Sequence, residues 1–305
     1  MAVQISGPNR ARRMRRARGW TLALPGAAIL VPFLAVVLFY GIWMAVHGER
    51  LTEAGTADDF VGLENFARAL GDETLRQSVW VTIVYVAVAV LGQMVIGVSI
   101  ALLMNRKFLG KSIVRALILI PMVLVPVVAA LTWRLLMDPG NGMINWIFGQ
   151  LGLGSDHAFL SDSATALLAV VLVDIWQNTP FVVIIVLAGL ESLERAPFEA
   201  ASLDGAHGWR LIRHITLPMM QPVLAIVVLL RIIDAAKTFA LIQTMTRGGP
   251  GTSTMAISNF VYRTGFELFD VGYAAALALL TSAALIVVIF PAARRLMGLD
   301  GRDRT

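Results

Sequence analysis

Six apolar stretches, each long enough to cross a lipid bilayer, constrain this chain more than any other feature. They lie at about 20–46, 78–104, 113–137, 164–187, 222–244 and 271–293. An α-helix rises about 1.5 Å per residue, so about 20 apolar residues cross a hydrocarbon core of about 30 Å. The sequence therefore predicts an all-α polytopic membrane protein with six transmembrane helices.

The overall composition agrees with this class. Of the 305 residues 57% are hydrophobic and 15% are charged, and the mean hydropathy is +0.75. A soluble domain carries about 25% charged residues, so a soluble globule is excluded. The chain has no cysteine, which excludes a disulfide framework and any metal site with cysteine ligands.

The basic residues are distributed as a topology signal. The net charge is +5, and seventeen of the 25 Lys and Arg residues fall on one predicted side of the membrane. They are Arg10, Arg12, Arg13, Arg15, Arg16, Arg18, Arg106, Lys107, Lys111, Arg115, Arg195, Arg210, Arg213, Arg294, Arg295, Arg302 and Arg304. Because basic residues concentrate on the cytoplasmic side of membrane proteins, both termini are predicted to lie in the cytoplasm. We expect no nucleic-acid partner.

The predicted organisation follows from these spans. Residues 1–19 form a basic cytoplasmic N-terminus, and 20–295 form one transmembrane domain with a cytoplasmic loop at about 188–221. Residues 296–305 form a cytoplasmic tail. The first apolar stretch exceeds the 7–15 residues of a signal-peptide core, so we expect an uncleaved anchor helix. The outer loop 47–77 is predicted to contain a short helix near 61–70.

No enzyme signature is complete. Gly110-Lys111-Ser112 resembles the end of a phosphate-binding loop, but Asn105 stands where that motif requires glycine. The four histidines lack the spacing of a zinc site. We predict that the chain has no catalytic residues, no metal and no cofactor of its own.

Charged residues recur within the fifth apolar stretch. Arg231, Asp234 and Lys237 are spaced three apart, and Thr238 follows Asp234 by four, so a continuous helix would present them on one face. A charge at the bilayer centre costs about 2.5–3.5 kcal/mol on insertion scales, so this face must point into protein or water. It is either a network that locks helices together or the polar wall of a substrate pathway.

The fourth stretch contains a second polar group. Asp174, Gln177 and Asn178 share one helix face, and Trp176 and Phe181 offer aromatic surfaces for a sugar ring. Carboxylate and amide groups hold hydroxyl-rich ligands. The alternative is an interhelical hydrogen-bond cluster, with a kink at Pro180.

A polar segment of about twenty residues, 199–218, separates two apolar stretches. Pro197 favours the start of a short helix, and Asp204-Gly205 favours its end. A short exposed helix of this kind enters grooves in partner proteins, whereas the alternative is a solvated linker. A second irregular segment, Arg247–Thr254, cannot stay helical because Gly248-Gly249-Pro250-Gly251 occupies its centre.

These two segments carry a family resemblance. Glu199-Ala200-Ala201, Asp204-Gly205-Ala206 and Ile215-Thr216-Leu217-Pro218 resemble the EAA loop of ABC-importer permeases. Thr246–Thr254, with its Gly-Gly-Pro, is similar to a loop of the binding-protein-dependent sugar permeases, a family that includes the maltose-importer subunits. The resemblance runs over about 20–295 and implies the type I ABC-importer permease fold.

The resemblance implies roles for particular residues. Glu199, Ala200, Ala201, Asp204, Gly205 and Ala206 would couple the chain to an ATPase; in this reading Glu199 contacts the ATPase and Gly205 permits the turn. Gly248, Gly249, Pro250 and Thr252 would face an extracytoplasmic binding protein. The ligand contacts, with those proposed above, would be Asp174, Trp176, Gln177, Asn178, Phe181, Arg231, Asp234, Lys237 and Thr238.

It also implies partners and a mechanism. The chain would sit in the bacterial cytoplasmic (inner) membrane among lipid, with a second similar permease, two ATPase subunits that bind ATP and Mg²⁺, and a solute-binding protein. Carbohydrate would cross by alternating access. This chain departs from the family pattern at Ala240, where relatives often carry an acid, and at Arg247, so the identity of the sugar does not carry over; the extra charge hints at an anionic one.

Two other classes compete with this interpretation. An ion-coupled secondary transporter would use the Arg231, Asp234 and Lys237 face as a relay. Such carriers usually contain two inverted halves with matching broken helices, and the sequence shows no such repeat. A structural or signalling subunit would leave the mid-membrane charges and the Gly-Gly-Pro loop unexplained.

Overall fold

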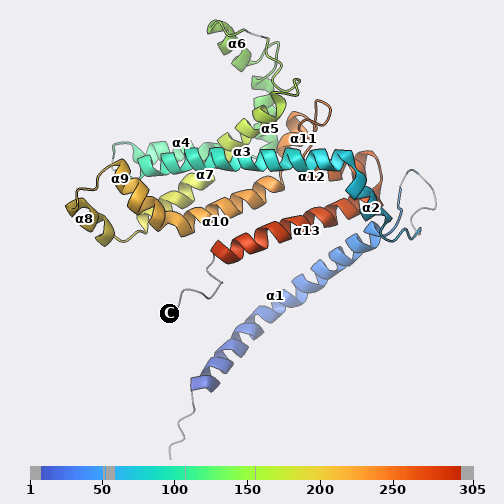
Figure 1. Cartoon of the computed structure of the whole chain (residues 1–305), viewed down its shortest axis with the longest axis horizontal. Helices are drawn as coiled ribbons and strands as arrows, with labels where there is room; N and C mark the ends of the chain where they lie inside the picture. The colour runs from blue at the N-terminus through green and yellow to red at the C-terminus, as the bar shows by residue number, and fades with distance from the viewer. Residues whose placement is uncertain (1–7, 51, 53–58, 107, 155, 297–305) are drawn as a thin grey trace, which may run out of the picture.

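A computed structural model describes residues 8–50, 52, 59–106, 108–154 and 156–296, and the described part is helical (Figure 1). Four predicted stretches fall on long helices: α1 (Pro8–Ala45), α3 (Glu73–Met104), α7 (Ala166–Glu191) and α13 (Val271–Leu296). The shorter helices are α2 (Glu64–Gly71), α6 (Met143–Gln150), α8 (Ala196–Leu203), α9 (Trp209–Leu211) and α12 (Ile257–Tyr262). The predicted all-α polytopic fold is confirmed, and α2 matches the helix expected near 61–70.

The third predicted stretch is not one helix. It divides into α4 (Lys111–Val123) and α5 (Pro126–Leu136), which meet at an angle of 96°. Pro126 disfavours helical geometry at the preceding residue, and Val125 is extended, with ψ 135°. The prediction of a continuous helix over 113–137 is therefore wrong. Within the described residues five helices are long and apolar enough to span a membrane, and this bent pair would make six.

The fifth predicted stretch is also interrupted. α10 (Leu217–Ala236) stops before Lys237, and α11 (Ala240–Met245) starts after Phe239. The side-chain amide of Asn259 on α12 donates to the Phe239 carbonyl at 3.4 Å, and that carbonyl also accepts from the Gln243 N–H at 2.9 Å, so a neighbouring helix adds a contact at the break. The continuous helix expected over 222–244 is wrong, and Lys237 and Thr238 lie in the break.

The core lies between α3, α7 and α10 (Figure 1). α3 and α7 approach so closely that a Cβ on Gly97 would stand 2.7 Å from Cβ of Val182. The absence of a side chain at Gly97 permits this approach. Tyr85 and Val170 are fully buried between these helices. This tight packing is what allows polar side chains on α3, α7 and α10 to meet in the interior.

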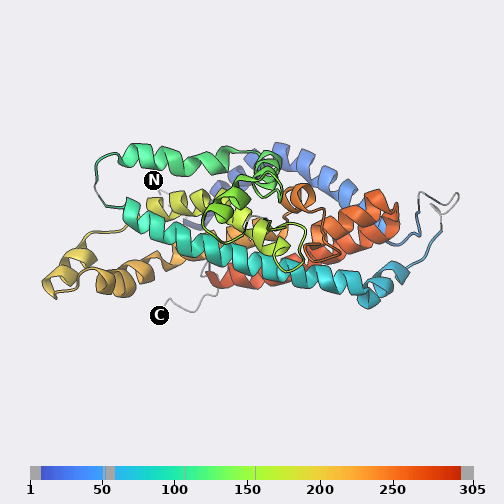
Figure 2. The same cartoon turned by 90° about the horizontal axis from the view of Figure 1, so that it is seen from above.

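The two ends of the molecule carry different elements. Both views place α8 and α9 at one end and α2 at the other, with α3 running between them (Figures 1 and 2). The side of the membrane on which each end lies stays a prediction. The predicted segments 1–7 and 297–305, with Lys107, Arg302 and Arg304, lie outside the described residues.

At the α2 end, a polar clasp joins α2 to the start of α13. Arg68 donates to Asp270 at 2.6 Å and lies 4.0 Å over the Tyr273 ring, while Tyr273 donates to Asp72 at 2.7 Å. Partial burial raises the pKa of Asp72, but this hydrogen bond, with those from the Leu75 and Thr74 N–H groups, holds the pKa below its ordinary value. Asp72 also caps α3 through those N–H groups.

α1 stands apart from the other helices. Its apolar side chains are largely exposed, including Ile29 at 78% and Phe39 at 69%, and its main contact is with α13 (Figure 1). At Gly272 on α13, a Cβ would collide with the carbonyl oxygen of His47, just after α1, and crowd the Met44 carbonyl of α1. Glycine is therefore required where the two helices meet.

We expect Gly272→Ala to destabilise the protein by about 1–3 kcal/mol, as overpacking against backbone does. Gly41→Ala is the matched control, because nothing lies within 4 Å of a Cβ built there. Thermal unfolding of the two variants in the same detergent tests this expectation. Equal midpoints would show that α1 yields to the added methyl group.

Candidate functional site

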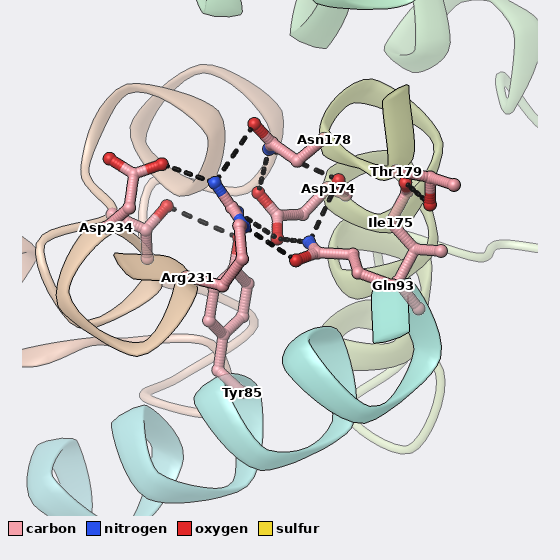
Figure 3. Close-up of polar contacts among 9 residues, drawn as sticks. Tyr85, Gln93, Asp174, Ile175, Asn178, Thr179, Arg231 and Asp234 are labelled. Carbon is pink, nitrogen blue, oxygen red and sulfur yellow. Dashed lines mark hydrogen bonds and ion pairs between the residues drawn. The ribbon is translucent and has the colours of Figure 1, made fainter. Parts of the chain in front are cut away.

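Arg231 on α10 is the centre of a polar network in the helix core (Figure 3). Its guanidinium donates to Asp234 at 2.6 Å and to Asn178 at 3.4 Å, and lies 3.8 Å from the Asp174 carboxylate. The Arg231 side chain is 3% exposed. Carboxylates and an amide therefore surround the buried cation and offset the cost of removing it from water.

Gln93 on α3 completes this network and is absent from the predicted set. Its amide donates to the Asp174 carboxylate at 2.8 Å, while its oxygen accepts from Nε of Arg231 at 2.8 Å. Asn178 donates to the other Asp174 oxygen, also at 2.8 Å. Gln93 is fully buried, so it joins α3, α7 and α10 through one side chain (Figure 3).

A cavity of about 730 Å³ opens beside this network. Eight of the nine predicted ligand residues line it: Asp174, Gln177, Asn178, Phe181, Arg231, Asp234, Lys237 and Thr238. The predicted single helix face is not what lines it. The end of α10 contributes Arg231 and Asp234, and the break after α10 contributes Lys237 and Thr238. The two readings of the charges are therefore compatible, because the network both joins the helices and forms a cavity wall.

Trp176 is the predicted residue that does not line the cavity. It packs edge-on against Trp133 on α5, with ring centroids 5.4 Å apart. Arg134, the residue after Trp133, donates to the Thr244 carbonyl on α11 at 3.2 Å. These contacts join α5 to α7 and α11.

Two helix breaks frame the cavity. Leu124 and Pro126 line it from the α4–α5 break, and Lys237, Thr238 and Phe239 line it from the α10–α11 break. Gln177 on α7 donates to the Leu124 carbonyl at 2.9 Å, and Thr238 lies 3.3 Å from the Tyr85 hydroxyl. Irregular backbone at membrane depth is tolerated where it lines a cavity, and this is the arrangement seen here.

The predicted coupling helix forms at the opposite end of α10. α8 begins with Pro197 in its first turn and ends in a Schellman motif, in which the N–H groups of Gly205 and Ala206 donate to the Ser202 and Ala201 carbonyls at 3.2 and 2.9 Å. Gly205 has φ +75°, which favours glycine. Glu199, Ala200 and Asp204 are exposed, and Ala201 is buried.

Large apolar side chains accompany this helix. Leu203 is 89% exposed and Trp209 is 67% exposed. Phe198 turns inward and lines a second cavity of about 520 Å³ between the loop and the ends of α3 and α7. After α9, a π-helical turn, η2 (Ile212–Thr216), connects the loop to α10. The loop therefore exposes large apolar side chains at this end of the molecule.

The Gly-Gly-Pro segment folds into a tight turn. Thr246 and Thr254 hydroxyls lie 2.7 Å apart, and Thr254 donates to the Gly249 carbonyl at 2.8 Å. Gly248 is buried with φ +85°, and a Cβ there would stand 2.6 Å from Cε of Met255. Gly249, Pro250 and Thr252 are partly exposed. The turn thus presents part of its predicted contact surface.

Known proteins share this architecture. Residues 93–297 match the family described as binding-protein-dependent transport system inner membrane component. A probable ABC transporter permease protein, y4oQ of Sinorhizobium fredii, is 37% identical over 93% of each chain. The trehalose/maltose permease MalF of Thermococcus litoralis is 34% identical over 86% of this chain and 88% of its own.

The fold itself has a solved counterpart. A bacterial alginate ABC transporter, crystallised with an alginate-bound periplasmic protein, contains a chain that superimposes with a TM-score of 0.76. The two are 21% identical, and the match covers 92% of this chain and 94% of the other. With the family match over most of its length, this chain belongs to the inner-membrane permease components of binding-protein-dependent ABC importers.

Proposed function

We propose that this chain, with a second similar permease, forms the translocation pathway of an ATP-driven carbohydrate importer that works by alternating access. The observation that carries the proposal is that residues near the C-terminal end of α10, including Arg231 and Asp234, line the cavity. One candidate span, Trp209–Ala236, joins the exposed loop that follows Glu199 to the buried Arg231 network. A movement of the loop would therefore reach the ligand residues through a single element.

The partners in this proposal are those that the family resemblance implies. Two ATPase subunits would take α8 in a surface cleft and bind ATP and Mg²⁺, so this chain would bind no cofactor and catalyse no reaction. A binding protein would deliver the sugar at the Gly248–Thr252 turn. The relative named as a trehalose/maltose permease and the alginate transporter's bound periplasmic protein support the carbohydrate and the binding protein respectively.

Purification of the tagged chain in mild detergent tests this function. We expect an ATPase and a second permease to co-purify, and Glu199→Ala to lose the ATPase. Glu194→Ala is the control, since Glu194 is an exposed acid of the same loop outside α8. A chain that purifies alone in every form would contradict the proposal.

A transport assay separates this proposal from the ion-coupled carrier. Uptake of a labelled sugar into vesicles, measured with trehalose, maltose and an acidic disaccharide, should require internal ATP and persist when a proton ionophore is added. Uptake that stops with the ionophore and continues without ATP would favour the relay hypothesis for Arg231, Asp234 and Lys237.

A further inference from the structure

We propose that the cavity binds a carbohydrate that carries an anionic group, and that Lys237 recognises this group. The inference rests on the proposed function, because it names the chemical class of the sugar. It starts from the charges that line the cavity, which are Asp174, Arg231, Asp234 and Lys237.

Three of these charges are already paired. Arg231 contacts the carboxylates of Asp234 and Asp174 at 2.6 and 3.8 Å, and Gln93 holds the opposite side of the guanidinium. The Lys237 side chain makes no ion pair or hydrogen bond with any residue that the structure describes, and it is exposed to the cavity. It is thus the cavity charge left for a ligand.

The surroundings of Lys237 contain few acidic side chains that could pair with it. Asp234, three residues earlier, gives one carboxylate oxygen to Arg231. Ala240, three residues later, lines the cavity without charge, and the sequence contains no acid between Asp234 and Glu267. The α4–α5 wall carries none between Lys107 and Met137. The acids that line the cavity from this chain are therefore those of the Arg231 network.

A purely structural role explains Lys237 less well. A lysine at a helix C-terminus interacts favourably with the last carbonyl groups, and Lys237 directly follows α10. That role would not require the side chain to face a membrane cavity, where an unpaired cation is disfavoured and typically marks a substrate pathway. The ammonium group has three donors, which suit a carboxylate or a sulfonate.

The rest of the lining suits a sugar ring. Phe181 and Phe239 provide aromatic surface in the same cavity. Oδ1 of Asp234 and the amide oxygen of Gln177 accept no hydrogen bond from the described residues, so both can accept from ligand hydroxyls. The expected ligand is therefore an acidic sugar, such as a uronic acid or a sulfonated glycoside.

Equilibrium binding to the purified importer complex in lipid nanodiscs tests this inference. The probes are a labelled glucose disaccharide and the same disaccharide with one glucose oxidised to glucuronate. We expect the glucuronate probe to bind about tenfold tighter or more, as charge-assisted hydrogen bonds allow. The preference should weaken in high salt.

Two independent variants test the unpaired charge of Lys237, one by removing it and one by giving it an acidic neighbour. Lys237→Gln keeps the polar side chain without the charge and should abolish the preference, whereas Lys237→Arg should retain it. Ala240→Asp would give Lys237 an acidic neighbour at three residues' distance and should also abolish the preference. Ala240→Asn adds a side chain of the same size without the charge, so a preference lost only in Ala240→Asp assigns the loss to the added carboxylate.

The outcomes separate the two proposals. A native complex that binds both probes equally or prefers the neutral one would overturn the inference and leave the carbohydrate importer standing, as would a preference that survives in Lys237→Gln. A complex that neither binds nor transports any sugar would overturn the proposed function, and the inference with it.

Discussion

Replacing Gly205 with valine is expected to lower ATP-driven transport at least about tenfold. Gly205 holds φ +75° and closes the Schellman motif at the end of α8. A β-branched residue is strained in this conformation by about 1–3 kcal/mol. An eight-residue helix is marginal on its own, so a strain of this size is enough to unwind it and remove the surface that Glu199 presents.

Gly205→Asn is the matched control, since asparagine tolerates the left-handed region better than other non-glycine residues. Nothing lies within 4 Å of a Cβ at this position, so the Cβ of neither side chain clashes with the fold. We expect ATPase co-purification and ATP-dependent uptake to fall at least about tenfold in Gly205→Val, as a loss of about 1.4 kcal/mol produces, and to persist in Gly205→Asn. Full transport by the valine variant would show that the turn is not needed for coupling.

The second large effect is expected at Arg231. Arg231→Met leaves the buried Asp174 carboxylate with two amide partners and no cation, and breaking a buried pair in this way costs about 3–5 kcal/mol. Asp234→Asn should cost about 1 kcal/mol or less, because the Asp234 side chain is 66% exposed. We therefore expect folded protein to be lost in the first variant and kept in the second.

A double variant separates stability from transport. Arg231→Met with Asp174→Asn removes both buried charges and should recover most of the folded protein without recovering uptake. Thermal unfolding followed by size-exclusion chromatography measures the first property, and vesicle uptake measures the second. If Arg231→Met unfolds no earlier than Asp234→Asn, the network does not stabilise the core as the contacts indicate.

The sequence predicts the helical elements well because the length and apolar composition of a membrane span are directly visible in it. It does not reveal that two of the stretches break. The residues at Leu124 and Phe239 are apolar, and at each break an amide from another helix, Gln177 or Asn259, donates to a backbone carbonyl. The local sequence does not indicate a contact with a distant helix, although Pro126 indicates the break between α4 and α5.

The sequence likewise predicts only part of the candidate site. Helical spacing groups Asp174, Gln177 and Asn178 correctly, since all three lie on one uninterrupted helix. Helical spacing does not group Gln93 with them, because it is a lone amide in an apolar stretch and its partners lie 81 and 138 residues away in the chain. A buried glutamine in a predicted span is the signal that points to it, because the membrane interior demands a partner for its amide.

The position of α1 has a consequence for biosynthesis. This helix leaves the ribosome before the other spans, yet its main neighbour in the fold is α13, which starts more than two hundred residues later. At about 5–20 residues per second, α1 waits roughly 10–45 s in lipid before that neighbour exists. Its exposed aliphatic surface is suited to this interval, because a lipid-facing helix needs no partner to remain in the bilayer. Insertion and packing of the first span are thus separate events, and a defect at Gly272 would spare the former while impairing the latter.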